Sequence, residues 1–255
     1  MCMGQRIYAG AEQPSDVSIG FQERLGATVA LDAALRGEDG TPLTLRQLIR
    51  TPTILALVYY NCPNVCDYLL IGIAGALKSL TADPGRDFQV ITVSIDEQER
   101  PVDARRAKRI ALESIEKPFP PSAWRFLTGS GASVRALADS VGFRFARRGE
   151  GSFDHPVGLV ILSPEGRIVR YMPGADFLPA DLRLSLLEAS QGRVGPTIAR
   201  LVRLCFSVEP QGHKIVFRTL QVVGAVTLST AGLLVVYLVL AGRRRRRSGS
   251  GGQLT

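Results

Sequence analysis

Two cysteines lie four residues apart, where the sequence changes from an apolar run to a helical pattern. Cys62 follows the run 53–60, and Cys66 falls within the pattern 65–80. Residues i and i+4 share one face of a helix, so both sulfur atoms can point to the same place. The free N–H groups and the positive dipole end of a helix N-terminus stabilise thiolates. The pair therefore indicates thiol chemistry or a soft-metal site rather than two buried structural cysteines.

The spacing alone leaves three uses of the pair open. Two close thiolates can form a Cys62–Cys66 disulfide when oxidised, exchange disulfides with a partner, or bind a soft metal such as Cu(I). Three residues separate these cysteines, whereas the Cys-X-X-Cys motif of exchange enzymes is shorter. The wider spacing accommodates an ion between the sulfur atoms at least as well as it accommodates a disulfide.

The surrounding sequence alternates short apolar runs with helical patterns. The expected strands are 53–60, 88–95, 124–127, 155–162 and 168–172, and the expected helices are 65–80, 102–116, 130–141 and 181–191. A continuous apolar run such as 53–60 is typical of a strand buried on both faces. The last two strands flank a turn and predict a β-hairpin. This order predicts an α/β fold of the thioredoxin-like type, with antiparallel strands late in the chain.

His155 is the candidate for a third metal ligand, since two thiolates rarely complete a copper site. The only other histidine of the chain is His213. In a thioredoxin-like fold, the loop entering the strand 155–162 lies beside the cysteine-bearing helix, so His155 can reach the two sulfurs. Asp154 precedes it and can orient the imidazole as a supporting acid. His213 is expected to be structural or incidental.

Residues 219–242 predict one transmembrane helix. They form 24 uncharged residues rich in Val, Leu, Ala and Gly, and about 20 apolar residues span the hydrocarbon core of a bilayer. Five arginines, 243–247, follow directly, and arginines gather on the cytoplasmic side of a span. We therefore expect a single-pass cell-membrane protein with a cytoplasmic C-terminal tail and its main domain on the periplasmic side.

That orientation requires an export signal, and residues 1–20 contain no apolar run of the required length. We expect the natural start to lie upstream, or a signal to have been removed. Cys2 is expected to be an ordinary terminal residue, and Cys205 a small buried apolar side chain. The expected organisation is a lead-in over 1–26, a thioredoxin-like domain over 27–191, a linker over 192–218, the span over 219–242 and the tail over 243–255.

The net charge of +8 invites a nucleic-acid partner, but its distribution argues against one. Residues 243–247 supply five of these charges and leave +3 for the rest of the chain. The basic character is therefore largely that of a local tail, whose role is to orient the span. We expect no nucleic-acid binding.

Five segments resemble the Sco/SenC family of copper proteins, over residues 20–190. They read YYNCPNVCDYLL, VSIDEQERP, WRFLTG, ALADSVGFRF and DHPVGLVILSPEGRIVRYMPG. The late span with its arginine tail resembles a bacterial subgroup of that family. The resemblance implies that Cys62, Cys66 and His155 occupy the three ligand positions for Cu(I) or Cu(II). It also implies that Asp96 matches a family acid near the site, with a supporting role.

The sequence departs from the family pattern close to these ligands. The family commonly reads CPDVCP, whereas here Asn64 replaces the acid, Asp67 replaces the second proline, and Pro156 follows the histidine. All three ligands are retained. The departures therefore concern the partner surface and the redox potential more than the metal site.

The resemblance implies a protein that helps assemble the binuclear copper centre of cytochrome c oxidase, either by delivering copper or by reducing the cysteines of that centre. Our interpretation is a copper chaperone rather than an enzyme, with the copper-bearing oxidase subunit or another copper protein as partner. The alternative is an extracytoplasmic thiol–disulfide oxidoreductase, in which Cys62 and Cys66 cycle as a dithiol and His155 assists proton transfer. A peroxidase-like or redox-sensing domain is a third reading, and it would need only one reactive cysteine.

Overall fold

The computed structural model describes residues 19–61, 66–149, 151–194 and Thr230. The chain divides into two units, Met1–Ile198 and Ala199–Thr255. All of the helices and strands given below belong to the first unit.

A seven-stranded mixed sheet forms the centre of this unit, in the order β11-β10-β4-β5-β6-β2-β3. Its strands are β2 (Ala34–Gly37), β3 (Pro42–Thr44), β4 (Thr53–Val58), β5 (Gln89–Ser94), β6 (Trp124–Gly129), β10 (Gly158–Leu162) and β11 (Ile168–Pro173). The three central strands β4, β5 and β6 pair in parallel. The strands on both sides pair antiparallel, including the predicted β10–β11 hairpin. The sheet thus confirms the predicted mixed α/β, thioredoxin-like architecture.

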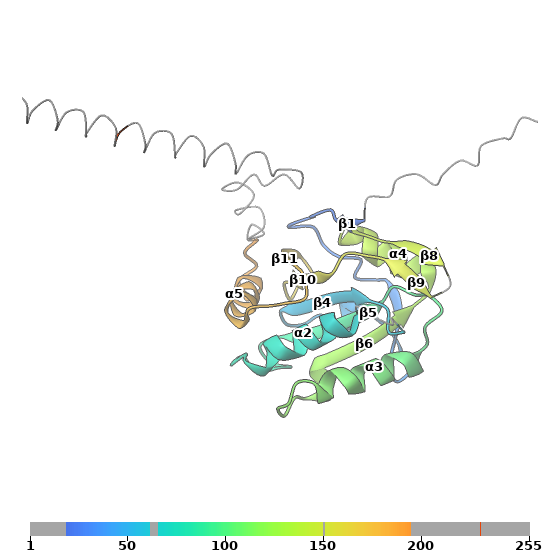
Figure 1. The fold of residues 1–255 in the computed structure, drawn as a ribbon, viewed down its shortest axis with the longest axis horizontal. Helices are drawn as coiled ribbons and strands as arrows, with labels where there is room; N and C mark the ends of the chain where they lie inside the picture. The colour runs from blue at the N-terminus through green and yellow to red at the C-terminus, as the bar shows by residue number, and fades with distance from the viewer. Residues whose placement is uncertain (1–18, 62–65, 150, 195–229, 231–255) are drawn as a thin grey trace, which may run out of the picture. The chain divides into compact units, whose positions relative to one another are not determined.

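Helices cover both faces of the sheet (Figure 1). They are α1 (Leu45–Leu48), α2 (Cys66–Lys78), α3 (Pro101–Glu113), α4 (Gly131–Ser140) and α5 (Pro179–Ser190), with a 3-10 turn η1 (Pro121–Ala123). Helices α2 and α3 connect successive parallel strands, and right-handed crossovers place such helices on one face of a sheet. Figure 1 shows α2 and α3 on one side and α4 on the other. The predicted helices 65–80, 102–116, 130–141 and 181–191 are therefore confirmed to within three residues at each end.

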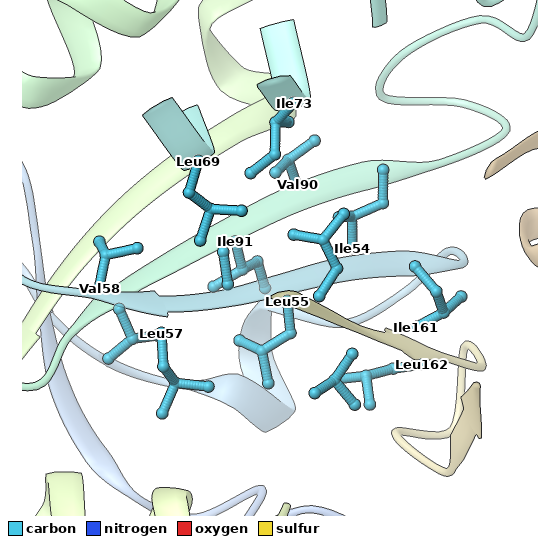
Figure 2. Close-up of a cluster of buried hydrophobic side chains, with 14 of the residues drawn as sticks. Ile54, Leu55, Leu57, Val58, Leu69, Ile73, Val90, Ile91, Ile161 and Leu162 are labelled. Carbon is cyan, nitrogen blue, oxygen red and sulfur yellow. The ribbon is translucent and has the colours of Figure 1, made fainter. Parts of the chain in front are cut away.

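The hydrophobic core covers both faces of the sheet, and one part of it lies between α2 and the central strands. Every residue of β4 is buried, as expected of a strand covered on both faces. Figure 2 shows Leu69 and Ile73 of α2 pointing toward the side chains of β4 and β5. This packing fixes where β4 ends and α2 begins, which is the junction that carries the cysteine pair.

Several short elements were not predicted from the sequence. β1 (Gly20–Phe21), within the expected lead-in, pairs with β7 (Phe143–Arg144), and β8 (Ala146–Gly149) pairs with β9 (Ser152–Asp154). These strands are two to four residues long, and β8 is largely exposed and charged. They therefore lack the apolar runs by which longer strands are recognised.

The largest difference between an expected and an observed strand boundary is at the start of β10. The strand expected over 155–162 begins at Gly158, so His155 lies in the loop between β9 and β10. Pro156 has no N–H to donate to a neighbouring strand, which disfavours sheet pairing there. Gly158 has φ +154°, and a Cβ atom at this position would lie 2.6 Å from the carbonyl oxygen of Met172. The close crossing explains why the strand begins at a glycine.

Among the described residues, no helix is both long and apolar enough to cross a bilayer. The predicted span 219–242 falls outside those residues except for Thr230. The span, the linker and the arginine tail therefore stay predictions.

Gly72 sets the distance between α2 and the connection that leads to α5. A Cβ atom at Gly72 would lie 1.9 Å from the backbone carbonyl oxygen of Ala175. Because that atom belongs to the main chain, Gly72→Ala must displace either α2 or the connection. We expect a loss of about 1–3 kcal/mol in the free energy of unfolding, measured by urea denaturation.

Gly75 provides the matched control on the same helix. A Cβ atom there would meet nothing within 4 Å. Gly75→Ala should raise the free energy of unfolding by about 0.5–1 kcal/mol, because alanine has the higher helix propensity. Equal effects of the two substitutions would contradict the role given to the Gly72 contact.

Glu38 ties the turn between β2 and β3 to α3 and β6. Its carboxylate lies 2.7 Å from Lys108 Nζ and 3.1 Å from Arg125 Nε, and it accepts a hydrogen bond from the Phe126 amide. The Glu38 side chain is 15% exposed and that of Lys108 is 12% exposed. Burial raises the pKa of Glu38, but the bonds from Lys108 and the Phe126 amide outweigh it, so the pKa lies below its usual 4.5.

Glu38→Gln should lower the free energy of unfolding at pH 7 by about 2–3 kcal/mol, since it leaves a mostly buried lysine without its counter-charge. The lowered pKa means that the folded state binds the proton less readily than the unfolded state. The stabilisation is therefore fully present above pH 4.5 and is lost as the pH falls through the folded-state value. Urea denaturation at pH 7 and pH 3 should show the difference between the two proteins shrinking at the lower pH.

Asp32→Asn is the control for this effect. Asp32 pairs with Arg46 at 2.7 Å, but these side chains are 74% and 58% exposed. Exposed ion pairs contribute about 0–1 kcal/mol. If Asp32→Asn lowered the free energy of unfolding as much as Glu38→Gln, burial would not explain the contribution of the Glu38 ion pair.

Candidate metal centre

The predicted cysteine pair lies at the junction between β4 and α2. β4 ends at Val58 and the described chain continues to Asn61, directly before Cys62. α2 begins at Cys66, so this cysteine occupies the helix N-terminus, as the sequence predicted. The positive end of the helix dipole favours a thiolate there. Cys62 and the Cys66 side chain lie outside the described part of the structure.

His155 packs against Tyr59, the first residue after β4. Its ring makes an edge contact with Tyr59, with 5.6 Å between ring centroids, and stacks at 6.0 Å on Phe143. Tyr59 is itself buried, and it precedes Cys62 by three residues. The structure thus brings the histidine loop to the strand that leads into the cysteine pair, although 92 residues separate His155 from Cys62 in the sequence.

The hydrogen bonding of His155 defines its tautomer. Nδ1 lies 3.0 Å from the carbonyl oxygen of Pro156, and a carbonyl can only accept, so Nδ1 carries the proton. Burial lowers the pKa of His155 below its usual 6.5, against the opposing effects of this carbonyl and the Asp154 charge. The imidazole is therefore neutral at pH 7, with Nε2 as the nitrogen that has a lone pair. A neutral imidazole is the form that binds a metal ion.

Asp154 and Asp96, the two acids given supporting roles, both contact the β8–β9 hairpin. Asp154 is bonded to Arg148 across the hairpin. Asp96 is 5% exposed, and its carboxylate lies 3.1 Å from Nη2 of Arg147. The Arg147 guanidinium in turn lies 4.5 Å from the centre of the Phe153 ring. Asp96 therefore fixes the hairpin that runs directly into His155.

Sequence reasoning missed a third acid, Glu99, and the aromatic residues that hold the histidine. Glu99 is 6% exposed and accepts hydrogen bonds from the Tyr60 and Asn61 amides. Burial, as the largest cause, raises the pKa of Glu99 above its usual 4.5, and the charge of Asp96 adds to this. The signal available in the sequence was a third acid in the run Asp96, Glu97 and Glu99, and acids are common on exposed turns.

Within the described residues, no group of three or more His, Cys, Asp and Glu side chains is placed to hold a metal ion. Both sulfur atoms of the predicted site lie outside that search. Two thiolates and a neutral imidazole nonetheless form a donor set that suits a soft cation such as Cu(I). The ligand set Cys62, Cys66 and His155 stays a prediction, and His155, the one of the three whose side chain is described, is in a suitable protonation state.

Comparison with known proteins assigns the fold to a family. The family described as SCO1/SenC matches residues 24–188. The mitochondrial SCO1 homolog 1 of Arabidopsis thaliana is 25% identical over 138 residues, which cover 52% of this chain and 39% of that protein. The chain thus spans about two fifths of the length of this relative.

Solved structures agree with this match. A candidate electron transfer protein from Aquifex aeolicus VF5 is 27% identical, with a TM-score of 0.59 over 67% of this chain and 96% of that one. Copper-bound ScoI of Arabidopsis thaliana has the same fold, with 20% identity and a TM-score of 0.53 over 66% of this chain and 99% of that one. With most of its first unit matched by the family, the chain belongs to the SCO1/SenC family.

Proposed function

We propose that this chain is a copper chaperone in which Cys62, Cys66 and His155 hold copper as cargo. The observation that carries the proposal is the contact between His155 and Tyr59, because Tyr59 precedes Cys62 by three residues. Membership of the SCO1/SenC family supports it, as does the shared fold of the copper-bound Arabidopsis relative.

In this proposal each ligand has its own task. Two thiolates supply soft ligands for Cu(I), and the helix N-terminus at Cys66 stabilises them in the charged form. His155 presents a neutral imidazole, because the Pro156 carbonyl holds the proton on Nδ1. Transfer proceeds by ligand exchange, in which thiolates of the recipient replace those of this chain one at a time. The family resemblance favours the copper-bearing subunit of cytochrome c oxidase as recipient.

Copper binding by the purified chain tests the proposal. Cys62→Ser and Cys66→Ser should each abolish stoichiometric Cu(I) binding, measured by competition with a chromogenic Cu(I) chelator. His155→Ala should weaken binding at least about tenfold, since it removes one of three donors. His213→Ala, at the other histidine of the chain, is the control and should leave the affinity unchanged.

The same histidine variant separates the chaperone from the oxidoreductase alternative, which the helix N-terminal position of Cys66 also favours. In that reaction the Cys62–Cys66 dithiol reduces a partner disulfide and becomes a disulfide itself, and two partner thiols are released. An unchanged copper affinity in His155→Ala, together with slower disulfide exchange, would favour the oxidoreductase and exclude the chaperone.

We further propose that residues 219–242 anchor the protein in the cell membrane, with the folded domain outside the cytoplasm. The uncharged stretch and the five arginines that follow it support this orientation. In a bacterial host, with an export signal joined ahead of Met1, alkaline phosphatase fused after Arg218 should be active, because this enzyme works only outside the cytoplasm. The same reporter fused after Thr255 should be inactive. The opposite pattern would overturn the proposed orientation.

A further inference from the structure

The two backbone amides that precede Cys62 both point at one buried carboxylate. The Tyr60 amide donates to Oε2 of Glu99 at 2.8 Å, and the Asn61 amide donates to Oε1 at 2.6 Å. Glu99 is 6% exposed. Hydrogen bonds to a charged acceptor are about twice as strong as neutral ones, and a pair of them also fixes orientation. The carboxylate therefore restrains two consecutive peptide planes directly before Cys62.

The position of Glu99 is itself fixed by β5. The Ser94 hydroxyl, at the end of β5, donates to Oε2 of Glu99 at 2.6 Å. The same hydroxyl accepts the Asp96 amide at 3.0 Å. The turn after β5 is thus closed on itself, and Glu99 projects from it toward the end of β4. Since β4 and β5 are paired through Val58 and Ser94, the carboxylate connects two strands that already move together.

The side chains of the same two residues are anchored elsewhere. The Tyr60 hydroxyl donates to the Leu127 carbonyl at 2.7 Å, in β6, and the Asn61 side chain is bonded to Arg106 of α3. These contacts fix the two side chains, whereas the orientation of the main chain is fixed by the hydrogen bonds that the two amides donate. Glu99 is the group that holds both amides of this segment.

We infer that Glu99 is the positioning residue for Cys62, setting the direction in which the chain leaves Asn61. The inference rests on the proposed function, in which Cys62 is a copper ligand. Glu99 acts through the backbone, so its effect depends on reaching both amides at once. Preorganisation of this kind matters because a ligand held in place spends no binding free energy on being ordered.

Three variants of the full chain test the inference. Glu99→Gln keeps the length but offers one acceptor oxygen and turns an NH₂ group toward an amide. Glu99→Asp keeps the charge but is one methylene shorter, so it cannot span both amides. Glu97→Gln removes an acid two residues away that is exposed, and serves as the matched control. Cu(I) affinity should fall at least tenfold in both Glu99 variants and stay within twofold in Glu97→Gln.

Amide hydrogen exchange adds a readout that distinguishes local positioning from general destabilisation. In the Glu99 variants, exchange should accelerate at least tenfold at Tyr60 and Asn61 and stay unchanged at Leu55 and Val90, in the strand core. Equal acceleration at all four amides would overturn the inference, because Glu99 would then merely stabilise the fold. A wild-type Cu(I) affinity in Glu99→Asp would overturn it as well. A carboxylate too short to contact both amides would then be enough for copper binding.

The outcome for the wild-type chain separates this inference from the proposed function. If wild type binds no Cu(I), the chaperone proposal fails, and the inference is decided by a thiol equilibrium instead. One glutathione disulfide oxidises the Cys62–Cys66 dithiol to the disulfide and yields two molecules of glutathione. Glu99→Gln should shift that equilibrium constant at least threefold relative to Glu97→Gln. An unchanged constant would sink the inference.

Discussion

β4 is buried along its whole length, and this constraint places the candidate site. A charged side chain is costly to bury in a strand that is covered on both faces. Charged side chains are therefore expected only beyond the end of β4. The chain reaches that point after Val58, and within four residues it arrives at Cys62. The neighbouring parallel strand β5 ends at the same edge, which brings its own polar turn alongside. The side chains that could bind a metal or react therefore lie at this edge of the sheet, because the rest of the two strands is buried in the core.

The turn after β5 contacts both parts of the site. Asp96 bonds to Arg147 and so holds the hairpin that leads into His155, while Glu99 bonds to the amides that lead into Cys62. Two segments distant in the sequence thus share one support. Burial raises the pKa of Glu99, and the nearby charge of Asp96 raises it further. The hydrogen bonds that Glu99 accepts from Ser94, Tyr60 and Asn61 act in the opposite direction.

The long elements could be predicted from the sequence because their patterns are strong. The apolar runs that became β4 and β5, and the helical pattern of α2, are set by burial alone. The strands β2, β3, β8 and β9 escaped prediction because they are only three or four residues long and lack the apolar runs by which longer strands are recognised. The later start of β10 has a local cause, because Pro156, directly after His155, has no N–H to donate to a neighbouring strand.

The sequence could predict those residues of the candidate site whose type alone indicates metal binding or thiol chemistry. Cysteines at this spacing and a histidine are conspicuous, whereas a glutamate such as Glu99 looks like any surface acid until its burial is known. The same holds for Tyr59, whose contact with His155 depends on how two distant loops meet.

The bond from His155 Nδ1 to the Pro156 carbonyl affects how many protons are released when a metal ion binds. Metal binding releases protons from ligands that must first lose them. This imidazole is already neutral, and its remaining proton sits on the nitrogen that faces the carbonyl. A cation that binds at Nε2 therefore displaces no proton from the histidine. Any acid released during loading would come from the thiols alone, so the number of protons released per ion would report how many cysteines were protonated beforehand.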